Sequence, residues 1–277
     1  MLTYPQIDPV IFKIGPFQVR WYGLMYLISF FASFFLCRYQ LKERGQQDLY
    51  SFLENLLFYS FIGLIIGARL GFCFFYYPDY FLTHPWEIPA VWKGGMSFHG
   101  GAIGAIITGY FYIKRHNQRF FYWADLIIVT APLGIFLGRI GNFINGEIFG
   151  KPTDLPWGMI FPEGGPIPRH PVQLYESLVT GIFLFLLLWC LRKKPWKEGS
   201  KFALFLILYG ILRFLFEFLR VPAQSFSLIW GWMTMGQVLC LIMILSGIFL
   251  FFFLYKDKVS TSFIKLFAKR KFSKKTL

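Results

Sequence analysis

A glycine-rich stretch with an arginine, two asparagines and a glutamate follows a long apolar run at 126–137. The stretch reads GRIGNFINGEIFG from Gly138 to Gly150. Glycine adopts positive φ angles and lets backbone N–H groups approach a ligand closely. Arg139 offers a planar guanidinium group that suits a phosphate. This combination predicts a glycine-permitted turn that recognises an anion at one face of a membrane.

Two further charged side chains lie within another apolar run. Arg213 and Glu217 are four residues apart and therefore share one helix face, and Tyr209 lies one turn earlier on that face. Ionisable groups inside a membrane are costly and usually mark function. The pair could instead neutralise itself and lower the cost of insertion. The added tyrosine favours a stripe that lines a polar cavity.

A histidine and a third arginine also lie within apolar runs. His99 is followed by two glycines, which remove side chains that would shield it, so it could act as a general base near neutral pH. A lone histidine is more often structural, and glycines also permit close helix contact. Arg69 is open to a structural interpretation, in which it pairs with Glu147, Glu176 or a carbonyl group.

The composition predicts an integral membrane protein. Apolar residues make up 56% of the 277 residues, the mean hydropathy is +0.52 and only 15% are charged, against about a quarter in soluble domains. The four cysteines form no CxxC pair, which argues against a disulfide framework or a zinc site. The net charge of +14 lies mainly in connecting segments, so nucleic-acid binding is not indicated.

Seven apolar runs are long enough to cross a bilayer, which takes about 20 residues. We therefore predict an all-α integral membrane protein with a single polytopic domain over 1–277. The proline- and glycine-rich link at 143–171 should fold over the membrane surface as a cap. The predicted spans lie near 21–37, 51–77, 96–113, 122–142, 172–191, 202–219 and 233–255.

The distribution of lysine and arginine predicts how the chain sits in the membrane. The connections at 38–50, 114–121, 192–201 and 256–277 carry 19 of the 28 basic residues, and the connections on the other side carry 6. Basic residues favour the cytoplasmic side, so the N-terminus should lie outside and the C-terminus in the cytoplasm. The basic tail at 256–277 fits an interfacial helix on anionic lipid headgroups.

This orientation brings the polar residues to one level near the outer face. Arg139 and Asn142 end the fourth span, and His99 begins the third. Arg213 and Glu217 lie in the outer half of the sixth span, and Tyr22 starts the first. We expect them to form one site.

Five motifs are spread over nearly the whole chain: RWYGLMYL at 20–27, HGG at 99–101, GRIGNFINGEIFG at 138–150, RHPVQLYE at 169–176 and YGILRFLFEFLR at 209–220. Together they resemble the motifs of bacterial prolipoprotein diacylglyceryl transferases. The glycine-rich stretch corresponds to the signature of that family.

The resemblance implies a reaction at the outer face of the bacterial cytoplasmic membrane. The sn-1,2-diacylglyceryl group of phosphatidylglycerol passes to the lipobox cysteine in a prolipoprotein signal peptide, and glycerol 1-phosphate is released. No metal or other cofactor is required, and the partners are lipids and the precursor, not nucleic acid.

The resemblance also implies roles for individual residues. Arg139 would bind the lipid phosphate, Arg213 would add a second positive charge, and Glu217 would orient Arg213. The candidate proton handlers are His99, Tyr22 and Tyr209, and the headgroup pocket would be shaped by Asn142, Asn145, Gly146 and Glu147.

Two other classes of membrane protein compete with this interpretation. A transporter would also have a polar interior and glycine-broken helices, but its polar residues should reach the midplane and the inner face. Here only Glu54, Asn55 and Asp125 lie towards the inner face. An intramembrane protease would need a serine, paired-aspartate or zinc motif, and the sequence contains none of these.

Overall fold

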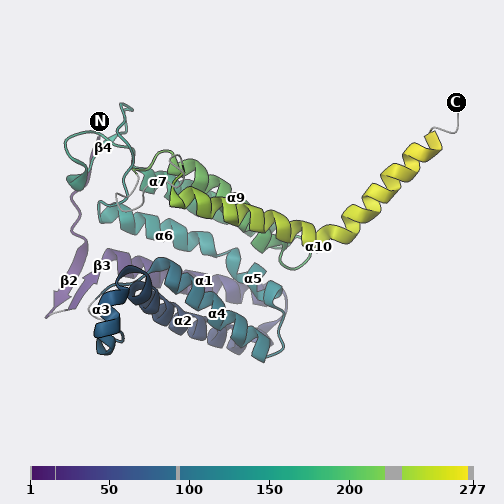
Figure 1. The fold of residues 1–277 in the computed structure, drawn as a ribbon, viewed down its shortest axis with the longest axis horizontal. Helices are drawn as coiled ribbons and strands as arrows, with labels where there is room; N and C mark the ends of the chain where they lie inside the picture. The colour runs from purple at the N-terminus through teal and green to yellow at the C-terminus, as the bar shows by residue number, and fades with distance from the viewer. Residues whose placement is uncertain (1, 16, 92–93, 222–232, 274–277) are drawn as a thin grey trace. The chain divides into compact units, whose positions relative to one another are not determined.

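A computed structural model describes residues 2–15, 17–91, 94–221 and 233–273 (Figure 1). Within these ranges, the side chains of 14, 17, 98, 99 and 257–273 are not described. The described chain is mostly helical, with short strands β1 (Leu2–Thr3), β2 (Val10–Ile14), β3 (Phe17–Arg20) and β4 (Met159–Ile160).

The longer helices coincide with the predicted spans. They are α1 (Trp21–Glu43), α2 (Tyr50–Tyr76), α4 (Phe98–Arg115), α5 (Phe120–Ile128), α6 (Ala131–Ile144), α9 (Ser200–Glu217) and α10 (Met235–Ser273). The span at 172–191 consists of α7 (Val172–Glu176), a π-helical segment η5 (Ser177–Phe183) and α8 (Leu184–Leu191). The connections contain α3 (Pro78–Thr83) and the 3₁₀ turns η1 (Gln47–Leu49), η2 (Pro85–Glu87) and η4 (Pro162–Gly164).

By length and composition, four of the described helical segments can cross a membrane, or five if the bent pair α5 and α6 forms one span. These segments support an all-α membrane protein, while the seven spans and the orientation stay predictions. The span expected at 122–142 is broken, because α5 and α6 meet at a bend of 42°. Pro132 in the first turn of α6 lacks an N–H group and cannot continue the helix of α5.

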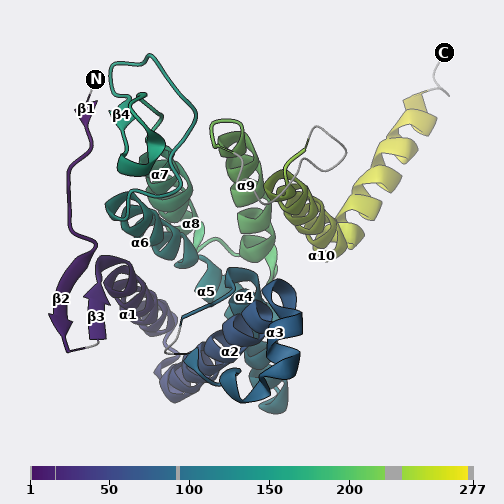
Figure 2. The same cartoon turned by 60° about the vertical axis from the view of Figure 1, so that its left-hand side comes forward.

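The chain divides into two compact units. Unit 2 comprises residues 34–123, and in it α2 and α4 lie side by side (Figures 1 and 2). Glycines allow this contact, because a Cβ atom on Gly67 would overlap the carbonyl oxygen of Gly100, and one on Gly104 would overlap that of Gly63. Small residues spaced in this way permit close helix packing in membranes.

Unit 1 comprises residues 1–33 and 124–277. Its core contains Val129, Leu184, Leu188 and Phe205, from α8, α9 and the segment between α5 and α6. The carboxylate of Asp125 accepts hydrogen bonds from the backbone N–H groups of Gly199 and Phe202, at 3.0 and 2.8 Å, and so caps the start of α9.

The N-terminal segment before α1 contacts both the predicted cap and the end of α6. Strands β2 and β3 form a hairpin, and β1 pairs with β4 of the cap in a parallel register. The Tyr4 hydroxyl lies 2.6 and 2.9 Å from the carbonyl oxygens of Phe143 and Ile144, which it can bind at the end of α6. The segment predicted as a cap therefore contains ordered structure, and it starts after α6 ends at Ile144.

Candidate functional site

Unit 1 contains a chain of ion pairs that joins three of its helices. On α6, Arg139 Nε lies 2.5 Å from Glu176 Oε2 at the end of α7. The other oxygen of Glu176 lies 3.8 Å from Arg213 Nη1 on α9. Arg213 Nη1 also lies 2.5 Å from Glu217 Oε2, which is 3.9 Å from Arg220 Nη1. Three guanidinium groups therefore share two carboxylates.

These arginines keep hydrogen-bond donors available for a ligand. Among the described residues, neither Nη2 of Arg139 nor Nη2 of Arg213 makes a hydrogen bond. Both side chains are mostly buried, at 16% and 14% exposed. Burial and the nearby charge of Arg213 lower the pKa of Arg220 to about 10, so it stays charged at neutral pH. The described ion pairs hold three guanidinium groups around two carboxylates, and guanidinium groups suit an anion with several oxygen atoms.

The second oxygen of Glu217 is fixed from α10. Thr234, which precedes α10, donates a hydrogen bond of 2.9 Å to Glu217 Oε1. Gly236 lies beside it, and a Cβ atom there would come within 2.8 Å of that carboxylate oxygen. Glu217 therefore contacts Arg213, and the pair belongs to a larger network; that Glu217 orients Arg213 for a ligand stays a prediction.

The glycine-rich stretch is helical in its first half. Gly138 and Gly141 lie inside α6, so the turn expected across the whole stretch is confined to its second half. Gly146 has a φ of +69° there, and Ile148 has a φ of +60°. A β-branched residue with positive φ is a genuine conformational outlier, and such strain clusters at functional sites.

The side chains of this turn form a second network next to Arg139. Arg139 Nη1 donates to Asn142 Oδ1 at 3.3 Å. The amides of Asn142 and Asn145 both donate to Glu147 Oε1, at 2.8 and 3.1 Å. Gln173 donates to the carbonyl oxygen of Glu147 at 2.5 Å. Glu147 thus joins the site through neutral amides and not through an ion pair.

Two of the predicted proton handlers lie in unit 1. Tyr22 packs against α6 where Gly141 leaves room, since a Cβ atom there would lie 2.9 Å from the ring. Its hydroxyl lies 3.0 Å from that of Tyr26, which interacts electrostatically with Arg139. Tyr209 interacts electrostatically with Arg139, with Arg213 and with Glu176, the carboxylate that lies between these two arginines.

The third predicted proton handler, His99, belongs to unit 2. Its backbone lies in the first turn of α4, which Ser97 caps by accepting a hydrogen bond from the Gly100 N–H at 3.3 Å. Its side chain is among those that the structure does not describe. The expected meeting of His99 with Arg139 and Arg213 therefore stays a prediction.

Arg69 binds backbone carbonyl groups. Its guanidinium donates to the carbonyl oxygens of Glu87, Ile88, Gly94 and Gly95 at 2.5–3.2 Å. Of the alternatives considered from the sequence, the carbonyl interpretation is the correct one. Arg69 thereby holds the segment that leads from α2 to α4.

The sequence predicts neither Glu176 nor Arg220 as a member of the site, although both lie in quoted motifs; Glu176 entered only as a possible partner of Arg69. Glu176 is 1% exposed and contacts two arginines. In the sequence, Glu176 is visible as a carboxylate at the start of an apolar run. Its partners Arg139 and Arg213 lie 37 residues before it and 37 residues after it. Arg220 was counted only among the basic residues of a connection.

The fold and the site define a helical membrane protein with a buried cluster of arginines that suits an anionic ligand. The family model for prolipoprotein diacylglyceryl transferase matches residues 9–253, and the chain belongs to this family. It is therefore a diacylglyceryl transferase.

Curated relatives support this assignment. The chain is 48% identical to the phosphatidylglycerol–prolipoprotein diacylglyceryl transferase of Pseudomonas paraeruginosa over 92% of its length and 97% of the relative. It is 49% identical to the enzyme of that name from Bordetella avium, with coverages of 91% and 96%. The corresponding enzyme of Desulfotalea psychrophila is 47% identical, with coverages of 92% and 96%.

Proposed function

We propose that the protein transfers the sn-1,2-diacylglyceryl group of phosphatidylglycerol to the thiol of a lipobox cysteine in a prolipoprotein signal peptide. The products are a thioether-linked diacylglyceryl peptide and glycerol 1-phosphate. The names of the relatives support the two substrates. This reaction would be the first step of lipoprotein maturation, at the outer face of the bacterial cytoplasmic membrane.

The observation that carries this proposal is the shared ion network of Arg139, Arg213 and Arg220. Phosphatidylglycerol carries one negative charge on its phosphodiester, which the guanidinium groups of this network would bind. The free Nη2 groups of Arg139 and Arg213 would bind its oxygens. Asn142, Asn145, Gly146 and Glu147 would shape the pocket for the glycerol headgroup.

The network also suits the bond changes of the reaction. A C–S bond forms at the glyceryl carbon, and the C–O bond to the phosphate breaks, with its electron pair staying on the leaving oxygen. The leaving group thereby changes from a singly charged diester to a doubly charged monoester. Guanidinium groups already placed around it stabilise charge as it develops, which is commonly the largest contribution to catalysis.

The thiol proton must pass to a base, because the thiolate is the nucleophile. We propose His99, Tyr22 and Tyr209 as the proton handlers. Tyr209 and Tyr22 are supported by their proximity to the network around Arg139. His99 is supported by the resemblance and by its glycine-flanked position. If His99→Gln kept near-normal turnover from pH 6 to 9, His99 would not be the base.

The proposed reaction can be tested with purified protein, acyl-labelled phosphatidylglycerol and a lipobox peptide. We expect label on the peptide and equimolar release of glycerol phosphate. The same peptide carrying Cys→Ser should accept no label. Absence of transfer to the cysteine peptide, or equal transfer to the serine peptide, would contradict the proposal.

The proposed orientation can be tested by labelling in intact cells. Asp154 is exposed in the cap, and Asn117 is exposed in the turn after α4. In a variant without native cysteines, a membrane-impermeant maleimide should label Asp154→Cys and leave Asn117→Cys unlabelled until the cells are lysed. The reverse pattern would place the network on the cytoplasmic side.

A further inference from the structure

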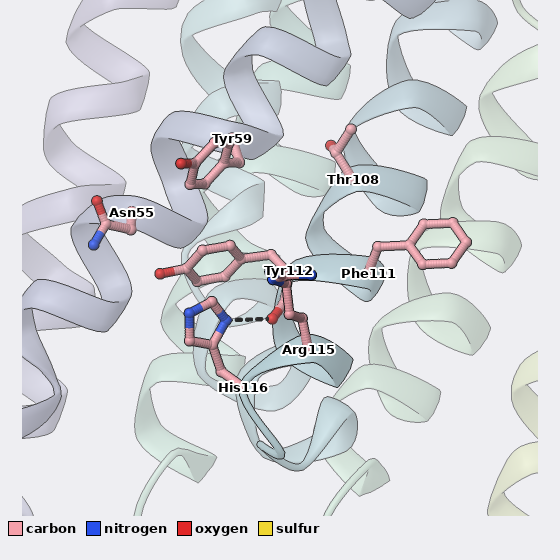
Figure 3. A pocket seen from close by; sticks show the side chains of 7 residues that line it. All are labelled: Asn55, Tyr59, Thr108, Phe111, Tyr112, Arg115 and His116. Atoms are coloured by element: carbon pink, nitrogen blue, oxygen red, sulfur yellow. Dashed lines mark hydrogen bonds between the residues drawn. The ribbon is translucent and has the colours of Figure 1, made fainter.

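Unit 2 contains a cavity of about 620 Å³ near the start of α2 and the end of α4. Asn55 and Tyr59 of α2 form one side of it, and Thr108 and Phe111 of α4 form the other (Figure 3). All of its lining residues belong to unit 2, and none belongs to the arginine network described above.

The sequence explains why a cavity opens at this end of the helix pair. Further along, α2 and α4 approach closely because glycines such as Gly67 and Gly104 face the partner helix. Near the cavity, aromatic side chains share the interface with glycines. The rings of Tyr59 and Tyr112 stack with their centroids 5.1 Å apart and line the cavity.

The cavity offers hydrogen-bond donors and no acid. Arg115 lines it and is exposed, and in the described part of the chain its guanidinium has no hydrogen bond or ion pair. The adjacent His116 donates from Nδ1 to the carbonyl oxygen of Tyr112 at 2.9 Å (Figure 3). In the neutral ring Nε2 is then an acceptor, so Arg115 is the residue of the lining that can donate to an anion as a cation. Its lining contains neither aspartate nor glutamate, so its charge suits an anion with several oxygen atoms, such as a phosphate.

An apolar stripe runs along α4 from this cavity. Phe111 lines the cavity and is 61% exposed. One and two turns earlier on the same helix face, Ile107 and Ile103 are 48% and 54% exposed. A soluble anion would not use this stripe, whereas the acyl chains of a lipid would lie along it.

We propose that the cavity binds the phosphate headgroup of an anionic phospholipid, with the acyl chains along the α4 stripe. Arg115 provides the charge, Asn55 provides a polar contact, and Tyr59 and Phe111 line the boundary between headgroup and chains. The basic loop after α4 is predicted to face the cytoplasm, so the lipid would belong to the inner leaflet. Only that choice of leaflet depends on the proposed orientation.

The test compares two neighbouring cations of the full-length protein. Arg115→Gln removes the cation that lines the cavity, and Lys114→Gln removes an exposed cation that does not line it. Lipid retention is measured by native mass spectrometry after transfer from vesicles of phosphatidylglycerol or of phosphatidylcholine. An Arg139→Ala background removes the lipid bound at the proposed transferase site, so the two sites are counted separately.

We expect Arg115→Gln to weaken retention of phosphatidylglycerol about fivefold, the usual contribution of one basic residue at an anionic membrane surface. Lys114→Gln should retain it as the parent does, and phosphatidylcholine should bind weakly throughout. Equal losses in the two variants would indicate non-specific surface charge and overturn the proposal. Displacement of the lipid by soluble glycerol phosphate would indicate a site for a free anion and would also overturn it.

Transferase activity separates this proposal from the proposed function. Without the Arg139→Ala background, Arg115→Gln should transfer the diacylglyceryl group as the wild type does. If the wild type transfers no lipid but retention still depends on Arg115, the proposed reaction is wrong and the cavity proposal stands. If transfer is normal and retention is insensitive to Arg115, the cavity proposal alone is wrong.

Discussion

Each of the two units buries arginine side chains among apolar helices, but the guanidinium groups have different hydrogen-bond and ion-pair partners. Arg69 of unit 2 is 4% exposed. Its Nε, Nη1 and Nη2 atoms all donate to backbone carbonyl oxygens, and its guanidinium lies over the rings of Phe72 and Phe81. Arg139 of unit 1 pairs with the carboxylate of Glu176, and its Nη2 makes no hydrogen bond in the described part of the chain.

This difference separates a structural arginine from a binding one. Carbonyl groups hold a guanidinium group in place without cancelling its charge. At Arg69 they accept hydrogen bonds from all three nitrogens. The side chain therefore holds two segments of the chain together. Carboxylates hold Arg139 and Arg213 in place, while their unused donors can reach a ligand. The residue type and the apolar surroundings are the same in both units, and the partners decide the role.

The largest effect should come from Arg69→Ala, and it should be on stability. The substitution leaves the carbonyl groups of Ile88 and Gly94 without their donor and Glu87 with only the Ala90 N–H, and each buried unsatisfied group costs about 1–3 kcal/mol. We expect a fall in the free energy of unfolding of about 3 kcal/mol or more, measured as a lower thermal unfolding midpoint in detergent. Arg69→Lys should not restore it, because an ammonium group cannot span the same carbonyls.

Arg38→Ala is the matched control for Arg69→Ala in the same unit. Arg38 is 38% exposed and pairs with Glu54 at 3.2 Å, and exposed pairs contribute about 0–1 kcal/mol. If both variants unfold at the wild-type midpoint, the structural role assigned to Arg69 is wrong.

The next effect, from Arg139→Lys, should be on activity. Lysine keeps a positive charge beside Glu176, so the unfolding midpoint should stay close to that of the wild type. It lacks the planar fork that would bind two phosphate oxygens. We expect kcat to fall about a hundred- to a thousandfold, as when one preorganised donor is removed from an active site. Transfer at the wild-type rate would show that Arg139 does not bind the phosphate.

The sequence predicted the helices and most members of the site because their signals are local. Apolar runs mark the helices, and the spacing of Arg213 and Glu217 places both on one face of α9. The bend before α6 was missed because hydropathy continues through it, although Pro132 was a visible breaker.

Contacts between distant segments could not be predicted from local patterns. Nothing in a linear sequence states that Glu176 lies between Arg139 and Arg213, because that contact depends on how α6, α7 and α9 pack. For the same reason the carbonyl partners of Arg69 were only one of several possibilities. The turn at Gly146 was expected from glycine chemistry, whereas the positive φ of Ile148 opposes its own preference.

Glu176→Gln should have an intermediate effect, because Glu176 contacts arginines rather than the proposed substrate. A neutral amide would let Arg139 and Arg213 move apart, and a misplacement of about 1 Å can cost up to a hundredfold in rate. We expect kcat/KM to fall about ten- to a hundredfold, and Glu176→Asp to recover part of it. Glu163→Gln makes the same chemical change in the exposed cap and should leave kcat/KM unchanged. If Glu176→Gln and Glu163→Gln both kept the wild-type kcat/KM, Glu176 would not position the arginines of the site.

The smallest effect should come from Gly138→Ala, although Gly138 opens the glycine-rich stretch. It lies inside α6, and a Cβ atom there would meet nothing within 4 Å. Alanine is better than glycine within a helix by about 0.5–1 kcal/mol, so the unfolding midpoint should rise slightly and kcat/KM should change less than about twofold. Gly67→Ala in unit 2 is the contrasting variant, because its Cβ would overlap α4, and overpacking costs about 1–3 kcal/mol. A large loss of activity at an unchanged midpoint in Gly138→Ala would mean that the bound lipid passes directly over α6 at this residue, and would extend the substrate site from Arg139 to this face of the helix.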